Sequence, residues 1–258
     1  MAEPFKVTAL RMGLIQDVDY SQIVYLKDMG KRMDFPTWGV LLQGQGKNIL
    51  VDMGIYDPEW ATKNIIKCTR EDVDDPIEGI KKAAGLTPED IDYIIFTHLH
   101  WDHIGEDLKP FKNARFVVQE TEWDYMFHPV SYQKWAYTSS VGVCLDKGLD
   151  FFQWQFVRGW VDVLPGLRLI PAPGHTPGHQ VVLVRAEEGR LIITGDSVNM
   201  IDNLNLNLPS GIFSDGEQYM ASMDLVRKYA DCIIAGHELA IRPFQTNSFP
   251  KIAHLEKE

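Results

Sequence analysis

The stretch "THLHWDHIGE", Thr97 to Glu106, contains three histidines and one aspartate within six positions: His98, His100, Asp102 and His103. Neutral imidazoles and carboxylates are the ligand types that zinc-like metals prefer. Side chains of an extended chain alternate between two sides, so His98 and His100 project to the same side and can bind one metal together. Asp102 and His103 follow in a loop or first helical turn and can face elsewhere. The cluster predicts a metal site, and its crowding favours two metals.

Three further candidate ligands each follow a short apolar run of the kind typical of a buried strand. They are His175 in "PAPGHTPGHQ", Asp196 in "IITGDS" and His237 in "IIAGHE". Because α/β proteins usually place their sites where strands end at one sheet edge, we expect these residues to converge with the cluster. If Asp196 bridges two metals, each metal receives four protein donors and has room for a water or hydroxide.

The sequence on either side of the cluster alternates between strand and helix patterns. The apolar run "IDYIIFT" (residues 91–97) leads into the cluster, and two strands joined by a Gly-containing turn are expected over residues 38–55. A helix is expected to end at Gly85. Further strands are expected at residues 114–119, 167–173, 179–186, 190–196 and 231–237, and helices near 121–127 and 215–230. This alternation favours one α/β domain over residues 1–258.

Two segments have a less certain place in this pattern. Residues 121–160 are expected to form an aromatic-rich helical insertion that packs into the core and can also wall the active site. Residues 14–36 are expected to be either an arm or pocket lid, or a plain surface loop. The aromatic residues of the first segment include Trp123, Trp135, Trp154, Trp160, Tyr137, Phe151 and Phe152.

Composition excludes some partners. The chain of 258 residues has 36 acidic and 25 basic residues, a formal net charge of -11, which repels a nucleic-acid backbone. No basic segment followed by an apolar run opens the sequence, and no apolar run is long enough for a membrane span. The three cysteines are far apart in the sequence and read as reduced thiols. We therefore expect a cytoplasmic protein that binds neither nucleic acid nor membrane.

The order H-x-H-x-D-H, G-H, G-D and G-H, from about Val51 to His237, resembles the metallo-β-lactamase fold superfamily. The resemblance implies an αβ/βα four-layer sandwich of two mixed β-sheets flanked by helices, with a dinuclear site on one edge. It also makes Asp52, in "VDMG", a supporting residue rather than a ligand. The implied ligands are His98, His100 and His175 for the first metal, Asp102, His103 and His237 for the second, and Asp196 as the bridge.

A pair of divalent cations held in this way favours hydrolysis. Such a centre lowers the pKa of bound water and polarises a carbonyl, so we expect attack by a metal-bound hydroxide. Asp102 is the candidate catalytic residue that passes the proton to the leaving oxygen. The ligands alone leave lactone, thioester, β-lactam and phosphodiester substrates open.

Within the superfamily, the chain most resembles the N-acyl homoserine lactonases through "HLHWDH", "PGHTPGHQ", the compact tail and the aromatic insertion. This implies two divalent metal ions, with zinc expected, a small-molecule lactone or ester as substrate, and a homodimer. The acidic composition disfavours a nuclease. Asp102 and a bridging Asp196 are unlike the true β-lactamases, and the short tail after His237 is unlike glyoxalase II-like thioesterases.

Two residues are expected to act near the substrate. His179 is expected beside the metals, and we group it with Asn199 as substrate-binding. The lactonases commonly carry a tyrosine three residues after the bridging aspartate, where this chain has Asn199. Asparagine can still donate a hydrogen bond but has a shorter reach, which favours a changed substrate.

Three alternatives stay open at this point. One is another lactonase, such as a pyridoxolactone-type enzyme. Another is a thioester or carboxylic ester hydrolase on the same fold. The third is a non-enzymatic metal-binding module, which is disfavoured because structural zinc sites are usually closed by cysteines.

Overall fold

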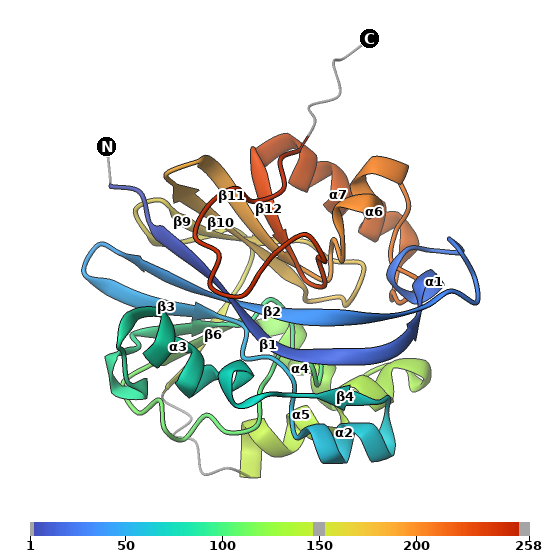
Figure 1. Ribbon diagram of the computed structural model, residues 1–258, viewed down its shortest axis with the longest axis horizontal. Helices are drawn as coiled ribbons and strands as arrows, with labels where there is room; N and C mark the ends of the chain where they lie inside the picture. The colour runs from blue at the N-terminus through green and yellow to red at the C-terminus, as the bar shows by residue number, and fades with distance from the viewer. Residues whose placement is uncertain (1–2, 147–152, 253–258) are drawn as a thin grey trace.

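The computed structural model describes residues 3–146 and 153–252, which form two β-sheets packed face to face with helices on both outer sides (Figure 1). The larger sheet has the strand order β4-β1-β2-β3-β5-β6-β7, and the smaller sheet has the order β12-β11-β10-β9-β8. Both sheets contain parallel and antiparallel neighbours. The expected αβ/βα four-layer sandwich of two mixed sheets is confirmed.

The strands of the larger sheet are β1 (Lys6–Asp19), β2 (Arg32–Gly44), β3 (Lys47–Val51), β4 (Cys68–Thr69), β5 (Tyr93–Ile95), β6 (Arg115–Gln119) and β7 (Trp154–Val157). Those of the smaller sheet are β8 (Val161–Leu164), β9 (Leu167–Pro171), β10 (Gln180–Ala186), β11 (Gly189–Gly195) and β12 (Cys232–Ala235). The helices are α1 (Tyr20–Ile23), α2 (Pro58–Asn64), α3 (Pro76–Ala84), α4 (Glu120–Phe127), α5 (Lys134–Asp146), α6 (Ile201–Leu206) and α7 (Gly216–Tyr229). Within the described residues, no helix has both the length and the apolar character needed to cross a membrane.

The alternation of side chains along each strand produces the layers. In β2, Val40 and Leu42 pack between the two sheets, whereas Leu41 packs against the helices of the larger sheet. In β11, Leu191 and Ile193 pack between the sheets and Ile192 packs toward α7. Because both faces of these strands are buried, they read as continuous apolar runs in the sequence.

Local sequence also fixes where helices start and stop. Asp75 caps α3 by accepting from the backbone N–H of Ile77, and Pro76 occupies its first turn. Gly85 ends this helix with a left-handed backbone (φ 68°), which glycine adopts without strain. The end expected at Gly85 is confirmed.

The segment 14–36 belongs partly to the sheet and partly to a surface turn. It comprises the last residues of β1, the short α1, a mostly exposed turn over residues 24–31 and the first residues of β2. The pairing of β1 with β2 shifts register between Arg11 and Leu14 and again between Ile15 and Val18. These irregularities obscure the strict alternation that signals a strand. Part of the segment forms a wall of the cavity described below, which Ile15, Val18 and Ile23 line.

The aromatic segment is mainly core. Trp123 and Trp154 are buried with ring centroids 4.7 Å apart, and Tyr137 is also buried. Trp135 lines the cavity, while Phe151 and Phe152 lie outside the described residues. Besides α4 and α5, the segment contains strand β7, so only part of the expected insertion is helical.

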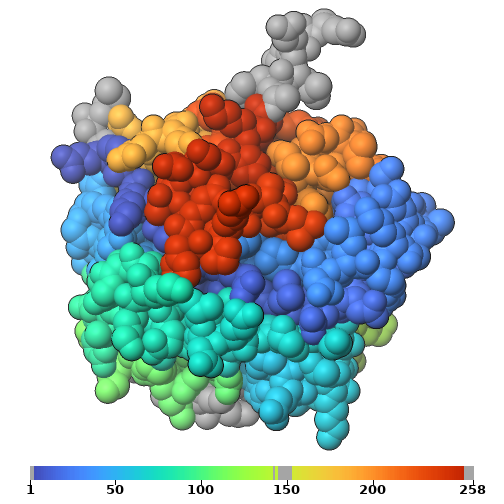
Figure 2. All heavy atoms as spheres, viewed as in Figure 1, coloured from blue at the N-terminus to red at the C-terminus, as the bar shows by residue number. Residues whose placement is uncertain are grey.

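The chain after β12 joins the two sheets. Its backbone pairs with β1 through the N–H groups of Ala9 and Phe244, and with β12 through the N–H of Ile233. Figure 2 shows this segment lying across the boundary between the two halves of the molecule. The joined sheets bring the ends of β5, β9, β11 and β12 to a common edge, where the seven predicted ligands lie.

Candidate metal centre and cavity

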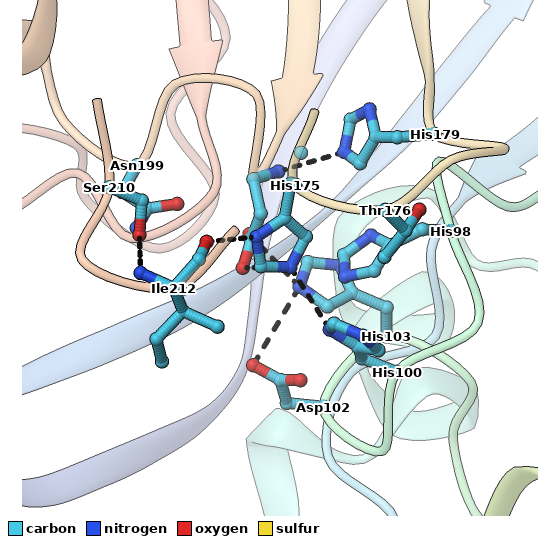
Figure 3. Close-up of polar contacts among 12 residues, drawn as sticks. His98, His100, Asp102, His103, His175, Thr176, His179, Asn199, Ser210 and Ile212 are labelled. Carbon is cyan, nitrogen blue, oxygen red and sulfur yellow. Dashed lines mark hydrogen bonds and ion pairs between the residues drawn. The ribbon is translucent and has the colours of Figure 1, made fainter. Parts of the chain in front are cut away.

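All seven residues expected to bind metal meet at the common edge of the two sheets, where each is at most 6% exposed. Figure 3 labels His98, His100, Asp102, His103 and His175 among them. The donor atoms of the seven residues form two groups, and within each group the atoms lie within 4.8 Å of one another. The first group is His98, His100 and His175, and the second is Asp102, His103, Asp196 and His237. The division is the one expected from the sequence, with Asp196 assigned by distance to the second group.

The two oxygens of Asp196 face different groups. Oδ2 lies 3.5 Å from Nε2 of His175, in the first group. Oδ1 lies 3.2 Å from Nε2 of His103 and 3.4 Å from Nε2 of His237, in the second group. Two donors bound at about 2.0–2.1 Å to one tetrahedral ion lie roughly 3.3 Å apart, so these spacings fit a shared cation in each group.

The glycine before His237 has a steric reason. A Cβ at Gly236 would lie 2.5 Å from Oδ1 of Asp196. Because that distance is shorter than any normal contact, only glycine lets β12 pass this close to the carboxylate. The close approach of two strand ends therefore explains why glycine precedes His237.

Three of the histidines use Nδ1 to fix their rings. Nδ1 of His175 donates to the carbonyl of Ile212 at 2.8 Å, and Nδ1 of His237 donates to the carbonyl of Pro36 at 2.9 Å. Nδ1 of His103 donates to the Asp52 carboxylate at 2.9 Å. Each of these bonds places the proton on Nδ1 and leaves Nε2 with a lone pair that faces the site.

Asp52 and Thr97 hold His98 in the same way. The Thr97 hydroxyl donates to the Asp52 carboxylate at 2.8 Å, so it can only accept from Nδ1 of His98 at 3.1 Å. Nε2 of His98 is buried and has no hydrogen-bond partner among the described residues. A bound cation would satisfy it, and the same holds for Nε2 of His103. The supporting contacts expected of Asp52 are confirmed.

Burial and neighbouring charges set the protonation of the site. Burial lowers the pKa of His98 and His100 well below the usual value for histidine, so both rings are neutral. Burial also opposes the charge on His103, but the carboxylates of Asp196, Asp102 and Asp52 outweigh it and raise the pKa of His103. A cation in the second group would take the place of the proton that these carboxylates favour on His103, because divalent metals bind neutral imidazole and ionised carboxylate.

Glu122 supports the site, although no pattern in the sequence predicts this role. This carboxylate is fully buried at the start of α4 and accepts from Leu99 N, Tyr137 Oη and Thr176 Oγ1 at 3.0, 2.7 and 2.6 Å. The backbone of Gly178 packs tightly against this residue, since a Cβ at Gly178 would lie 2.1 Å from the Glu122 nitrogen. Burial raises the pKa of Glu122, and these donors oppose that shift. It thus connects the loop of His98 and His100 to that of His175.

A cavity of about 390 Å³ opens beside the two groups. Its polar side includes His100, Asp102, His175, Asp196 and His237. Its apolar side includes Ile15, Val18, Ile23, Phe35, Ile65, Ile66 and Trp135. Cavities of this size and character hold small molecules with an apolar portion.

The two residues expected near the substrate have different positions. Asn199 lines the cavity, and its Nδ2 donates to Ser210 Oγ at 3.0 Å, so its contact with substrate stays a prediction. His179 lies behind Asp196, where its Nε2 accepts the Asp196 backbone N–H at 3.1 Å. It is fully buried and is not among the residues that line the cavity, so its contact with substrate stays a prediction.

Comparison with known proteins gives the family that the sequence motifs resemble. A model of the metallo-beta-lactamase superfamily matches residues 32–237, which include all seven site residues. The chain belongs to the metallo-beta-lactamase superfamily.

Several of the similar proteins are N-acyl homoserine lactonases by name. An N-acyl homoserine lactonase of Bacillus thuringiensis is 31% identical over 240 residues, which cover 86% of this chain and 89% of that protein. The solved structure of a quorum-quenching N-acyl homoserine lactone lactonase superposes with a TM-score of 0.75 at 29% identity, covering 95% of this chain and 98% of that one. An N-acyl homoserine lactone hydrolase solved with N-hexanoyl-L-homoserine at its catalytic metal center gives a TM-score of 0.76 at 26% identity, with the same coverage.

We predict that Glu122→Gln destabilises the protein by about 1–3 kcal/mol, because an amide nitrogen would face a donor and leave a buried N–H unpaired. Metal affinity should also fall by about 10- to 100-fold, since the loops carrying His98, His100 and His175 lose a common acceptor. Urea unfolding and metal titration measure both effects. Glu120→Gln is the matched control, because Glu120 is a half-buried residue of the same helix that pairs with exposed Arg158. Equal stability and metal affinity of the two variants would contradict the role of Glu122.

Proposed function

We propose that the chain is a metal-dependent hydrolase that opens the ring of an N-acyl homoserine lactone or a related lactone. The observation that carries the proposal is the Asp196 carboxylate, whose two oxygens face two separate groups of histidines beside a small-molecule cavity. The names of the relatives, N-acyl homoserine lactonases, support a lactone as the substrate.

The seven buried residues would hold two divalent cations. Their donor atoms are histidine nitrogens and carboxylate oxygens, a set that favours zinc. When bound, the cations would polarise a carbonyl oxygen and lower the pKa of a water molecule. In the proposed assignment His98, His100 and His175 would hold the first cation, and Asp102, His103 and His237 would hold the second. Asp196 would offer one oxygen to each.

Asp102 is the residue proposed to move the proton. Its Oδ2 lies 3.7 Å from Nε2 of His103 and of His237, and the side chain lines the cavity. During hydrolysis, water adds to the carbonyl carbon and the bond from that carbon to the ring oxygen breaks. The carboxylate can take the proton of the water and deliver it to the ring oxygen as the alcohol forms.

The apolar side of the cavity bears on the kind of substrate, whereas several other properties stay predictions. The apolar side of the cavity would take an acyl chain, since burial of methylene groups there is favourable. We propose that residues 1–258 act as one hydrolase domain. A contact of His179 with substrate, a homodimer, a cytoplasmic location and the absence of nucleic-acid binding stay predictions from the sequence.

The first prediction is lactone turnover that depends on metal. Purified protein should contain two divalent ions per chain by elemental analysis and should acidify a pH-indicator solution of N-acyl homoserine lactone. A chelator should abolish the acidification, and added zinc should restore it. The panel also includes simple aliphatic lactones, pyridine-fused lactones and a thioester. Turnover of the thioester with no turnover of any lactone by metal-loaded protein would overturn the proposal.

The second prediction concerns the proton. Asp102→Asn should lower kcat for the lactone by about 100- to 10,000-fold, because an amide cannot accept and release the proton. The control is Asp107→Asn, since Asp107 is an exposed residue of the same loop that only caps the N–H of Lys109. Metal analysis of both variants separates loss of the proton carrier from loss of a cation. An Asp102→Asn protein with unchanged kcat would exclude this role.

A further inference from the structure

Asn199 has a fixed place beside the metal centre. It lies in the loop between β11 and α6, three residues after Asp196. Its backbone carbonyl accepts the N–H of His237 at 2.9 Å, and its own N–H donates to Oδ1 of Asn203 at 3.1 Å. These bonds attach Asn199 to the loop of His237 and to α6, and the residue lines the cavity beside the metal centre.

The hydrogen bonds around Ser210 determine which end of the Asn199 amide faces which neighbour. The Ser210 hydroxyl donates its one proton to the carbonyl of Gln22 at 2.9 Å and accepts from the N–H of Ile212 at 3.1 Å. It can therefore only accept from Asn199, at 3.0 Å. The carbonyl of Ile23 lies 3.5 Å from the same amide nitrogen and can also only accept. The NH₂ end of Asn199 is thus committed to the protein (Figure 3 shows Asn199, Ser210 and Ile212 together beside His175).

The other end of the amide is a buried acceptor without a partner. Asn199 is 3% exposed, and its Oδ1 has no hydrogen-bond partner within residues 3–146 and 153–252. A buried carbonyl left unpaired is destabilising, so such groups in native proteins usually have a functional reason. Asn199 lines the cavity together with Ser210 and Asp196, so a ligand there lies beside this amide.

We propose that Oδ1 of Asn199 accepts a hydrogen bond from an N–H of the bound substrate, so that the pocket selects carbonyl substrates with an amide donor beside the scissile carbonyl. The class that fits is a lactone with an acylamino group on the carbon next to the ring carbonyl. This inference rests on the proposed lactone hydrolysis for the identity of the ring. It reverses the polarity expected from the sequence, since the pocket offers an acceptor here and a lactone without a donor leaves it unpaired.

The first test compares two substrates that differ in one group. They are N-hexanoyl homoserine lactone and its isostere with CH₂ in place of the amide N–H. The wild-type protein should prefer the N–H compound by about 10- to 100-fold in kcat/KM, which is the effect of a hydrogen bond to a buried unpaired acceptor. In Asn199→Leu, which has similar volume and no acceptor, the preference should fall to about onefold.

The control variant is Ser210→Ala. Like Asn199→Leu, it removes the hydrogen bond between Asn199 Nδ2 and Ser210 Oγ, but it leaves Oδ1 of Asn199 in place. It should therefore keep the preference for the N–H compound. A purely structural role of Asn199 would instead lower kcat/KM for both substrates equally and leave their ratio unchanged. That result would overturn the inference, as would a wild-type ratio near one, which does not depend on whether any variant folds.

A binding measurement separates this inference from the proposed function. The probes are the non-hydrolysable lactam analogue of N-hexanoyl homoserine lactone and its CH₂ isostere, titrated calorimetrically into metal-loaded protein. Tighter binding of the N–H lactam by wild type, lost in Asn199→Leu, supports the inference even if no lactone is turned over, an outcome that would overturn only the proposed function. Turnover of lactones with equal binding of both lactams would overturn the inference and leave the proposed function standing.

Discussion

The burial of seven ionisable side chains at one edge of two sheets is the constraint on which the rest of the structure depends. Five imidazoles and two carboxylates, each at most 6% exposed, converge there. Such groups are expensive to remove from water unless each polar atom is paired. Asp196 pairs with several of these groups at once, because one of its oxygens faces a histidine of the first group and the other faces two histidines of the second. The close approach of the strand ends, as at Gly236, follows from it.

Two further buried carboxylates hold this arrangement from outside. Asp52, which follows β3, accepts from Thr97 and His103 and so joins a neighbouring strand end to the second group. Glu122, which lies in α4, connects the loops that carry His98, His100 and His175. The helical layer therefore contributes to the geometry of the site, and substitutions far from the cavity are expected to reach it through these two residues.

The sequence predicted the parts of the molecule whose chemistry is local. The seven site residues could be read because histidines and aspartates at strand ends have few other uses in that pattern, and α3 could be read from Pro76 and Gly85. The distal part of β1 could not, because two register shifts interrupt its alternation and Gly13 and Asp17 have positive φ. It proved to wall the cavity.

Other features depend on contacts that no local pattern records. Glu122 is fully buried and accepts from three donors, whereas Glu120, two residues earlier, pairs with an exposed arginine. Nothing in the adjoining sequence distinguishes them. The orientation of the Asn199 amide is likewise set by Ser210, whose proton goes to the distant carbonyl of Gln22.

A crystal structure of the zinc-loaded protein, with anomalous diffraction measured at the zinc absorption edge, would show whether Asp196 lies between two cations. We expect two anomalous peaks. One lies between His175 and Oδ2 of Asp196, and the other lies between His103, His237 and Oδ1 of Asp196. A single peak, or two peaks with Asp196 bound to only one of them, would contradict this expectation.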